Sequence, residues 1–210
     1  SKIPPVNLRS FKAKARHRKT AMRRFLSKLE KQAPRGLDKQ IAVLEKEVWK
    51  ETDCLSCANC CKTMTPTYNP KDLKRISAHF KMSIPEFKKK YLKQERGGER
   101  DWMNKWTPCQ FLNLDDNKCS IYEIRPDDCA GFPHLSKKFK DYVHIHKQNV
   151  EYCPATYKLV EKMMEQLLSP LAEDVGDLIL KKSGIMCQYA NVPIEEDTVV
   201  LKKLYMHEVF

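Results

Sequence analysis

The feature that most constrains this chain is the run Cys54-Leu-Ser-Cys57-Ala-Asn-Cys60-Cys61, which places four thiols within eight residues. Ordinary core packing seldom requires such a density of cysteine. A Cys-x-x-Cys turn lets two sulfurs converge on one ion at about 2.3 Å, while backbone amides of the turn point at the sulfurs and lower their pKa. Because adjacent side chains usually point apart, Cys60 and Cys61 are expected to serve different ions or opposite sides of one cluster.

Further cysteines follow at longer spacing, and only a folded domain could bring them to the first four. Together they supply eight thiols, enough for two tetrahedral sites. The predicted metal ligands are Cys54, Cys57, Cys60, Cys61, Cys109, Cys119, Cys129 and Cys153. A ninth, Cys187, stands alone near the end of the chain and is expected to act as a small hydrophobe.

The sequence shows no apolar stretch of the roughly 18 residues that a membrane span requires, and no apolar core of a secretory signal. We therefore expect a cytoplasmic protein with no membrane partner. Glutathione and thioredoxin keep most cytosolic thiols reduced, so clustered cysteines in such a protein indicate metal ions rather than disulfides.

The identity of the metal stays open between zinc and iron, including an iron–sulfur cluster. A purely sulfur donor set suits either. The spacing Cys54-x-x-Cys57-x-x-Cys60 with a remote Cys153-Pro154 is similar to the ligand run of bacterial ferredoxins and favours a cluster. Two possible sets of four thiols favour zinc equally well.

Apolar periodicity and capping residues predict a mainly α-helical α+β fold. The domain is expected to be small, cysteine-rich and metal-centred, with a short β-hairpin, and to follow a basic helical hairpin. We divide the chain into the basic extension 1–50, the metal-binding domain 51–170, and a C-terminal helix and tail, 171–210. The predicted helices start at residues 8, 37, 70, 83, 154 and 171; the predicted strands are 109–112, 119–122 and 142–145, and 52–67 is a loop.

Positive charge is concentrated at the start of the chain. Residues 1–50 carry 15 Lys and Arg against 4 Asp and Glu, a net +11, whereas the remaining residues carry 24 against 23, a net +1. A solvated helix face, a contact with nucleic acid or the ribosome, and an organellar transit peptide would each explain this excess. Phosphate contacts would be blind to base sequence and would be made by Arg9, Lys12, Arg16, Arg23 and Arg24.

The cysteine run is followed by Pro-Cys-x-Phe-Leu, Cys-x-Ile-Tyr-x-x-Arg-Pro-x-x-Cys and Phe-Pro. With these motifs the region from Cys54 to Cys153 resembles the YkgJ-like cysteine-cluster proteins, a family described as zinc- or iron-chelating. The resemblance implies that the eight cysteines named above are the ligands and that Cys187 is not. The residue after Cys129 departs from the family: it is Ala130, where the family often has Arg. Any anion or substrate role of this position is therefore in doubt.

Metal chelation, with a structural or redox metal, is the function that these observations favour. A metal-dependent enzyme catalysing iron-dependent oxidation or methyl transfer is a second hypothesis, since an iron with an open position can do chemistry. A nucleic-acid- or ribosome-associated accessory protein with a structural metal is a third. No nucleotide loop or nucleophile–base pair can be recognised, so catalytic residues cannot be named, and His134, His144 and His146 are expected to be structural.

Overall fold

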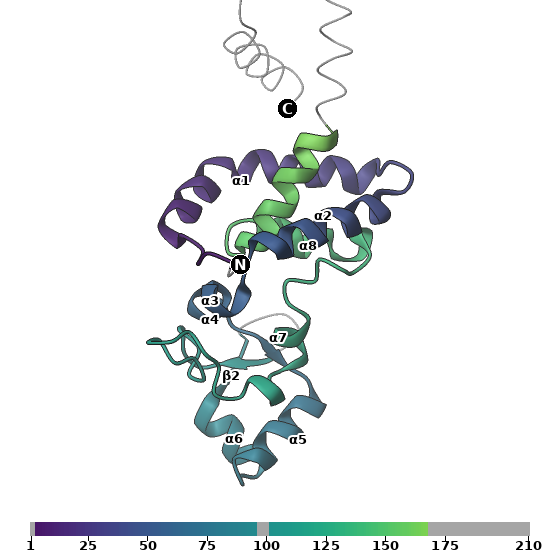
Figure 1. Cartoon of the computed structure of the whole chain (residues 1–210). Helices are drawn as coiled ribbons and strands as arrows, with labels where there is room; N and C mark the ends of the chain where they lie inside the picture. The colour runs from purple at the N-terminus through teal and green to yellow at the C-terminus, as the bar shows by residue number, and fades with distance from the viewer. Residues whose placement is uncertain (1–2, 96–100, 168–210) are drawn as a thin grey trace, which may run out of the picture.

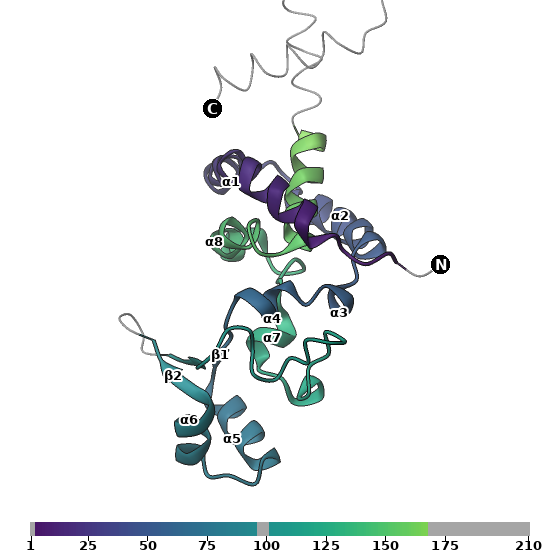
Figure 2. The same cartoon turned by 90° about the vertical axis from the view of Figure 1, so that its left-hand side faces the viewer.

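The computed structural model describes residues 3–95 and 101–167. Figures 1 and 2 show two lobes, one built from long helices and the other from two short helices and a small sheet. The short helices α3, α4 and α7 lie between them. The mainly α-helical α+β fold predicted above is confirmed. Among the described helices, none combines the length and the apolar character needed to cross a bilayer.

The helical lobe begins with the predicted hairpin of α1 (Leu8–Lys31) and α2 (Leu37–Glu51). The side chain of Asn7 caps α1 by accepting a hydrogen bond from the Ser10 amide at 3.0 Å. Gly36 turns the chain between the helices with a φ of +77°, a left-handed conformation that favours glycine. The residues of α1 that are buried recur at helical spacing: Phe11, Ala15, Met22, Phe25, Leu26 and Leu29.

This hairpin shares one apolar core with the later part of the chain. Helix α1 packs on α8 (Phe139–Asn149), and the helix over residues 154–167 lies against both elements of the hairpin (Figure 1). Segments more than 100 residues apart in sequence therefore bury one another's apolar faces. The later helices contribute Val143, Val150, Tyr157, Leu159, Val160, Met163 and Met164 to this core.

The second lobe contains α5 (Pro70–His79), α6 (Ile84–Tyr91) and a three-stranded sheet. Both helices begin as predicted, each with a capping box and with proline in the first turn. The strands β1 (Thr67–Tyr68), β3 (Trp102–Asn104) and β2 (Leu92–Gln94) pair antiparallel in that order. A separate core lies here, formed by Tyr68, Leu73, Ile76, Phe87, Leu92, Phe111 and Ile121.

The predicted hairpin strands at 109–112 and 119–122 are reduced to one isolated bridge, between Leu112 and Cys119. The chain does turn back there, since the Asn113 amide donates to the Lys118 carbonyl at 2.8 Å. Beyond the bridge the second segment winds into the 3-10 helix η1 (Tyr122–Ile124) instead of continuing as a strand. The sheet of the structure is built from other residues.

Two further predictions of local structure were wrong. Residues 142–145 are helical within α8, because Phe139, Val143 and His146 are buried at helical spacing. The predicted loop 52–67 contains the short helices α3 (Cys54–Cys57) and α4 (Asn59–Thr63), separated by Ala58 with a φ of 45°. The predicted helix from 171 and the residue Cys187 lie outside the described residues.

Candidate metal centre

The eight predicted cysteine ligands come from four parts of the fold that meet between the lobes. Helices α3 and α4 carry the first four, the turned segment around the Leu112–Cys119 bridge carries two, α7 (Asp127–Gly131) carries one, and the last precedes the helix over 154–167. A cavity of 300 Å³ lies where they meet. Its wall includes Cys54, Cys60, Cys61, Cys109, Cys119 and Cys129. The remaining two, Cys57 and Cys153, are buried, and all eight are free thiols.

Hydrogen bonds to backbone atoms hold the cysteine-bearing segments together. The amide of Cys109 donates to the carbonyl of Cys61 at 2.8 Å, which ties the turned segment to α4. The Asn117 side chain donates to the Ser56 carbonyl at 3.0 Å, and the Asn59 side chain donates to the Tyr152 carbonyl at 2.6 Å. These long-range contacts bring the cysteine-bearing segments side by side.

These asparagines escaped the sequence reasoning, as did Asn104, which is fully buried and whose amide group lies 3.1 Å from the sulfur of Cys109. The side-chain oxygen of Asn104 also accepts a hydrogen bond from the hydroxyl of Tyr68 at 2.7 Å. The sequence around Asn59 and Asn104 does not show which distant group each amide contacts, because both partners are set by the tertiary fold. Only the folded chain shows that these amides support the cysteines.

Six of the sulfurs line the cavity without forming a finished tetrahedron. The sulfurs of Cys60 and Cys61 lie 3.9 Å apart. Within residues 3–95 and 101–167, however, no three His, Cys, Asp or Glu side chains converge closely enough to hold an ion. Bound metal would therefore draw the thiols further together.

The cavity makes most of these thiols poor acids while they face only one another. Desolvation raises the pKa of Cys54 to about 12, and the neighbouring thiolates of Cys153 and Cys57 add to the effect. Burial likewise raises the pKa of Cys129. By contrast, a hydrogen bond from Cys60 lowers the pKa of Cys61 to about 7. A cation would reverse the unfavourable effects, because it stabilises the thiolate form of every ligand.

Backbone amides already favour the thiolate form at several sulfurs. Burial raises the pKa of Cys57, Cys109, Cys119 and Cys153, but in each case an amide hydrogen bond to the sulfur opposes it. The donors lie two or three residues further along the chain: Asn59, Phe111, Ile121 and Thr156 respectively. Amides directed at sulfur in this way are the arrangement expected of metal-binding cysteines. The donor set therefore fits a soft cation.

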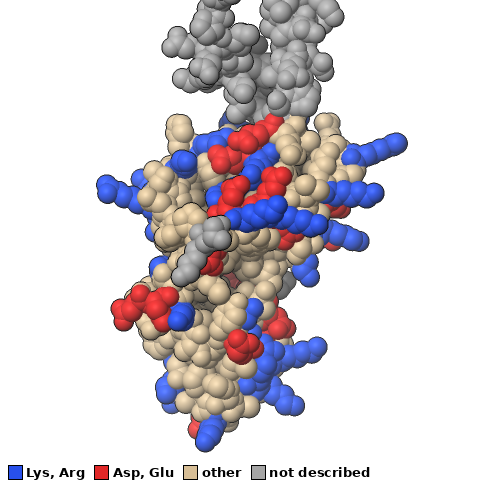
Figure 3. Space-filling model, viewed as in Figure 1, with Lys and Arg blue, Asp and Glu red and all other residues tan. Residues whose placement is uncertain are grey.

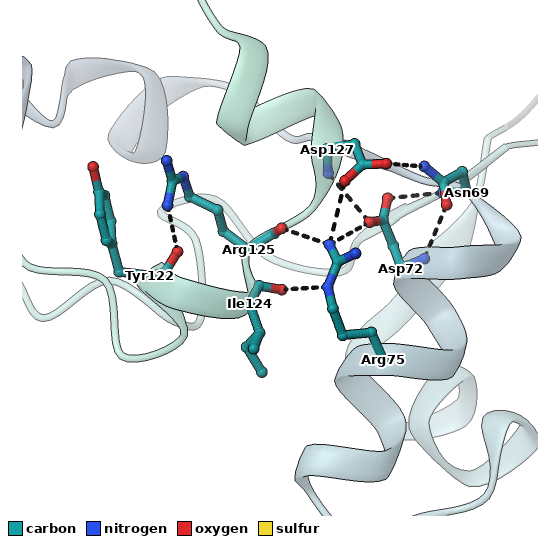
Figure 4. Close-up of polar contacts among 7 residues, drawn as sticks. All are labelled: Asn69, Asp72, Arg75, Tyr122, Ile124, Arg125 and Asp127. Atoms are coloured by element: carbon teal, nitrogen blue, oxygen red, sulfur yellow. Dashed lines mark hydrogen bonds and ion pairs between the residues drawn. The ribbon is translucent and has the colours of Figure 1, made fainter.

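Arg125 brings a positive charge to the cavity wall. Its guanidinium lies 3.9 Å from the centre of the Tyr122 ring and donates to the Tyr122 carbonyl at 2.6 Å (Figure 4). This cation also offsets part of the rise that burial causes in the pKa of Cys119. Arg125 therefore closes the turned segment and counters negative charge on the sulfur of Cys119.

A buried carboxylate, Asp72, fixes the start of α7, which carries Cys129. Asp72 accepts hydrogen bonds from the guanidinium of Arg75 at 2.7 Å and from the backbone amides of Asn69 and Asp127, each at 3.2 Å (Figure 4). Arg75 in turn donates to the Arg125 carbonyl at 2.9 Å. The first turn of α5 thereby holds the segment that leads into α7.

We expect Asp72→Asn to lower the free energy of unfolding by about 1 to 3 kcal/mol. The amide nitrogen of the new asparagine would face N–H groups that now donate hydrogen bonds to the carboxylate. The side chain of Asp72 is only 1% exposed, whereas that of Asp127 is 59% exposed. Asp127→Asn is therefore the matched control, with an expected change of about 0.5 kcal/mol or less. Chemical denaturation measures both variants, and equal effects would contradict the role given to Asp72.

Of the five basic residues predicted to contact nucleic acid, four are exposed and one, Arg23, makes intramolecular contacts. Arg9, Lys12, Arg16 and Arg24 are exposed, but Arg23 donates to the Lys147 carbonyl at 2.8 Å and to Glu151 at 3.1 Å. Along the same helix Arg18 pairs with Glu161, and Lys19 pairs with Glu151. Figure 3 shows acidic side chains interspersed among the basic ones on this lobe. Part of the positive charge of α1 therefore serves intramolecular contacts.

Comparison with known proteins agrees with this geometry. Residues 53–154 match the CxxCxxCC family, described as "Putative zinc- or iron-chelating domain". The chain is also 32% identical over 81 residues to the uncharacterized protein MJ0661 of Methanocaldococcus jannaschii, a match that covers 39% of this chain and 43% of that protein. No solved structure matches the chain. The region of this chain that matches the CxxCxxCC family model, residues 53–154, carries all eight cysteines described above.

Proposed function

We propose that this protein binds zinc or iron through the thiolates of its eight clustered cysteines, and that the metal serves as a structural or redox centre. The observation that carries the proposal is the shared cavity, which six of the eight thiols line. The two others, Cys57 and Cys153, are buried and receive backbone hydrogen bonds at sulfur. The expected ligands are those named from the sequence.

Several short segments would gain their conformation from the ion. Helices α3, α4 and α7 contain 4, 5 and 5 residues, far fewer than an isolated helix needs in water. A metal that links these segments would compensate for this weakness, since a structural zinc contributes on the order of 10 kcal/mol to folding. The shortness of these helices supports a structural role for the metal, with or without redox chemistry.

The test is the metal content of the protein purified without oxygen. We expect elemental analysis to find zinc or iron at one or more ions per chain. A brown protein with broad visible absorption would indicate an iron–sulfur cluster, and a colourless protein with zinc would indicate simple tetrahedral sites. A folded protein that takes up neither metal, even after anaerobic reconstitution with each, would disprove the proposal.

A variant with Ser at all eight positions provides the reference for nonspecific uptake. Cysteine to serine changes the size of the side chain little but removes the soft thiolate that zinc and iron prefer. Metal content that persists in this variant would show that other groups bind the ion. Loss of metal from the variant together with retention by the wild type supports the cysteine assignment.

A further inference from the structure

Four of the thiols lie on α4, on the turned segment and on α7, and we name them the turn set: Cys61, Cys109, Cys119 and Cys129. All four line the cavity. The bond from the Cys109 amide to the Cys61 carbonyl joins the turned segment to α4, and the Leu112–Cys119 bridge brings the other arm of that segment beside it. Helix α7 supplies the fourth member at the same wall. This set connects α4 to the lobe that contains α5 and α6.

The other four thiols come from α3, from the first turn of α4 and from the segment before the helix over 154–167, and we name them the helix set: Cys54, Cys57, Cys60 and Cys153. Two of them, Cys54 and Cys60, also line the cavity. Cys54 and Cys57 mark the ends of α3, and Cys60 lies in the first turn of α4. The Asn59 side chain reaches the Tyr152 carbonyl at 2.6 Å, which draws α4 to the residue before Cys153. Cys153 itself belongs to the core of the helical lobe.

Resting on the proposed function, we infer that the chain holds two separate metal centres, one in each set of four thiols, and that the adjacent residues Cys60 and Cys61 give one sulfur to each. A tetrahedral ion or a cubane cluster takes four cysteines, so eight thiols fill two centres. The 3.9 Å between the two sulfurs places the centres side by side, with α4 as their shared wall. Binding at one centre orients α4 for the other.

Titration of the reduced, metal-free full chain with Co²⁺, under anaerobic conditions, tests the number of centres without any substitution. Thiolate-to-cobalt absorption reports each tetrahedral sulfur site as it fills. We expect the absorption to rise until two ions per chain have bound and then to stop. An end point at one ion per chain would overturn the inference, although it would leave metal binding by the cysteines intact.

Paired substitutions test which cysteines share a centre, and each double variant lacks the same number of thiols. The within-set variants Cys119→Ser/Cys129→Ser and Cys54→Ser/Cys57→Ser are each expected to keep one centre, half of the wild-type cobalt. The cross-set variant Cys54→Ser/Cys119→Ser is expected to lose both. Equal retention by within-set and cross-set variants would overturn the division into sets.

The single variants Cys54→Ser and Cys119→Ser remove thiols that are not buried, so they are the least disruptive to folding. Each is expected to bind one Co²⁺ per chain, with helicity measured by circular dichroism on the same sample. Binding of two ions by either variant would contradict the assignment of that residue. Absence of cobalt binding by the wild type would instead defeat the proposed function, so the two failures are distinguishable.

Discussion

Removal of the metal by a chelator is expected to unfold the segments that carry the thiols and to lower the free energy of unfolding by on the order of 10 kcal/mol. That amount is comparable with the whole stability of a domain, about 5 to 15 kcal/mol. The physical reason is the weakness of the segments themselves. Helices α3, α4 and α7 are short, and the turned segment between Cys109 and Cys119 has one isolated β-bridge.

The loss is expected to be uneven along the chain. Helices α1 and α2 bury a continuous apolar face against α8 and the helix over 154–167, so much of their helicity should survive. Hydrogen exchange and limited proteolysis should instead find residues 52–66 and 105–133 unprotected. The matched control is the same chelator saturated with zinc beforehand. A metal-free protein with an unchanged far-ultraviolet spectrum and unchanged exchange would contradict the prediction.

Substitution of Phe87 by alanine is expected to lower the free energy of unfolding by about 3 to 5 kcal/mol. Phe87 is 0% exposed, and its ring centre lies 6.0 Å from that of Phe80 and 5.2 Å from that of Tyr91. The core of this lobe is small, so the cavity left by a missing ring cannot be filled by rearrangement elsewhere. Equilibrium denaturation of the metal-loaded protein measures the effect.

Leu114→Ala is the control, because Leu114 is 60% exposed. This substitution should lower the free energy of unfolding by about 0.5 kcal/mol or less. Phe87→Ala is also expected to weaken metal binding, since the same core contains Phe111 and Ile121, whose amides donate to the sulfurs of Cys109 and Cys119. If the two variants have equal stability, the packing role assigned to Phe87 is wrong.

The parts of the fold that could be predicted from sequence are those set by local patterns. The stripe of α1 and the capping residues Asn69 and Ser83 identify their helices, because helical spacing and N-cap hydrogen bonds involve residues within one or two turns. The strands β2 and β3 were missed, since each has three residues and pairs with a distant partner. Segments this short do not show the alternation of apolar and polar residues that identifies a strand in a sequence.

The error at residues 142–145 has the same origin. The segment Tyr142–Ile145 alternates in a way typical of a strand, but burial of Val143 together with Phe139 and His146 follows a helical repeat. The surface that selects this repeat belongs to α1, more than 100 residues earlier. The residues of 139–149 alone do not show whether they will be helical or extended, because the choice depends on packing against α1.

The sequence by itself determined which atoms are available for chemistry: eight clustered thiols, their Cys-x-x-Cys spacing, and the family model that the region matches. Tertiary structure alone decided which distant segments meet at the thiols, because neighbours in space are chosen by packing and by long-range hydrogen bonds such as that from Asn59 to Tyr152. Helix α4, which carries Cys60 and Cys61, is bonded to Cys109 of the turned segment as well as to Tyr152. These contacts join residues far apart in the chain, so they depend on the whole fold and not on the spacing of the cysteines.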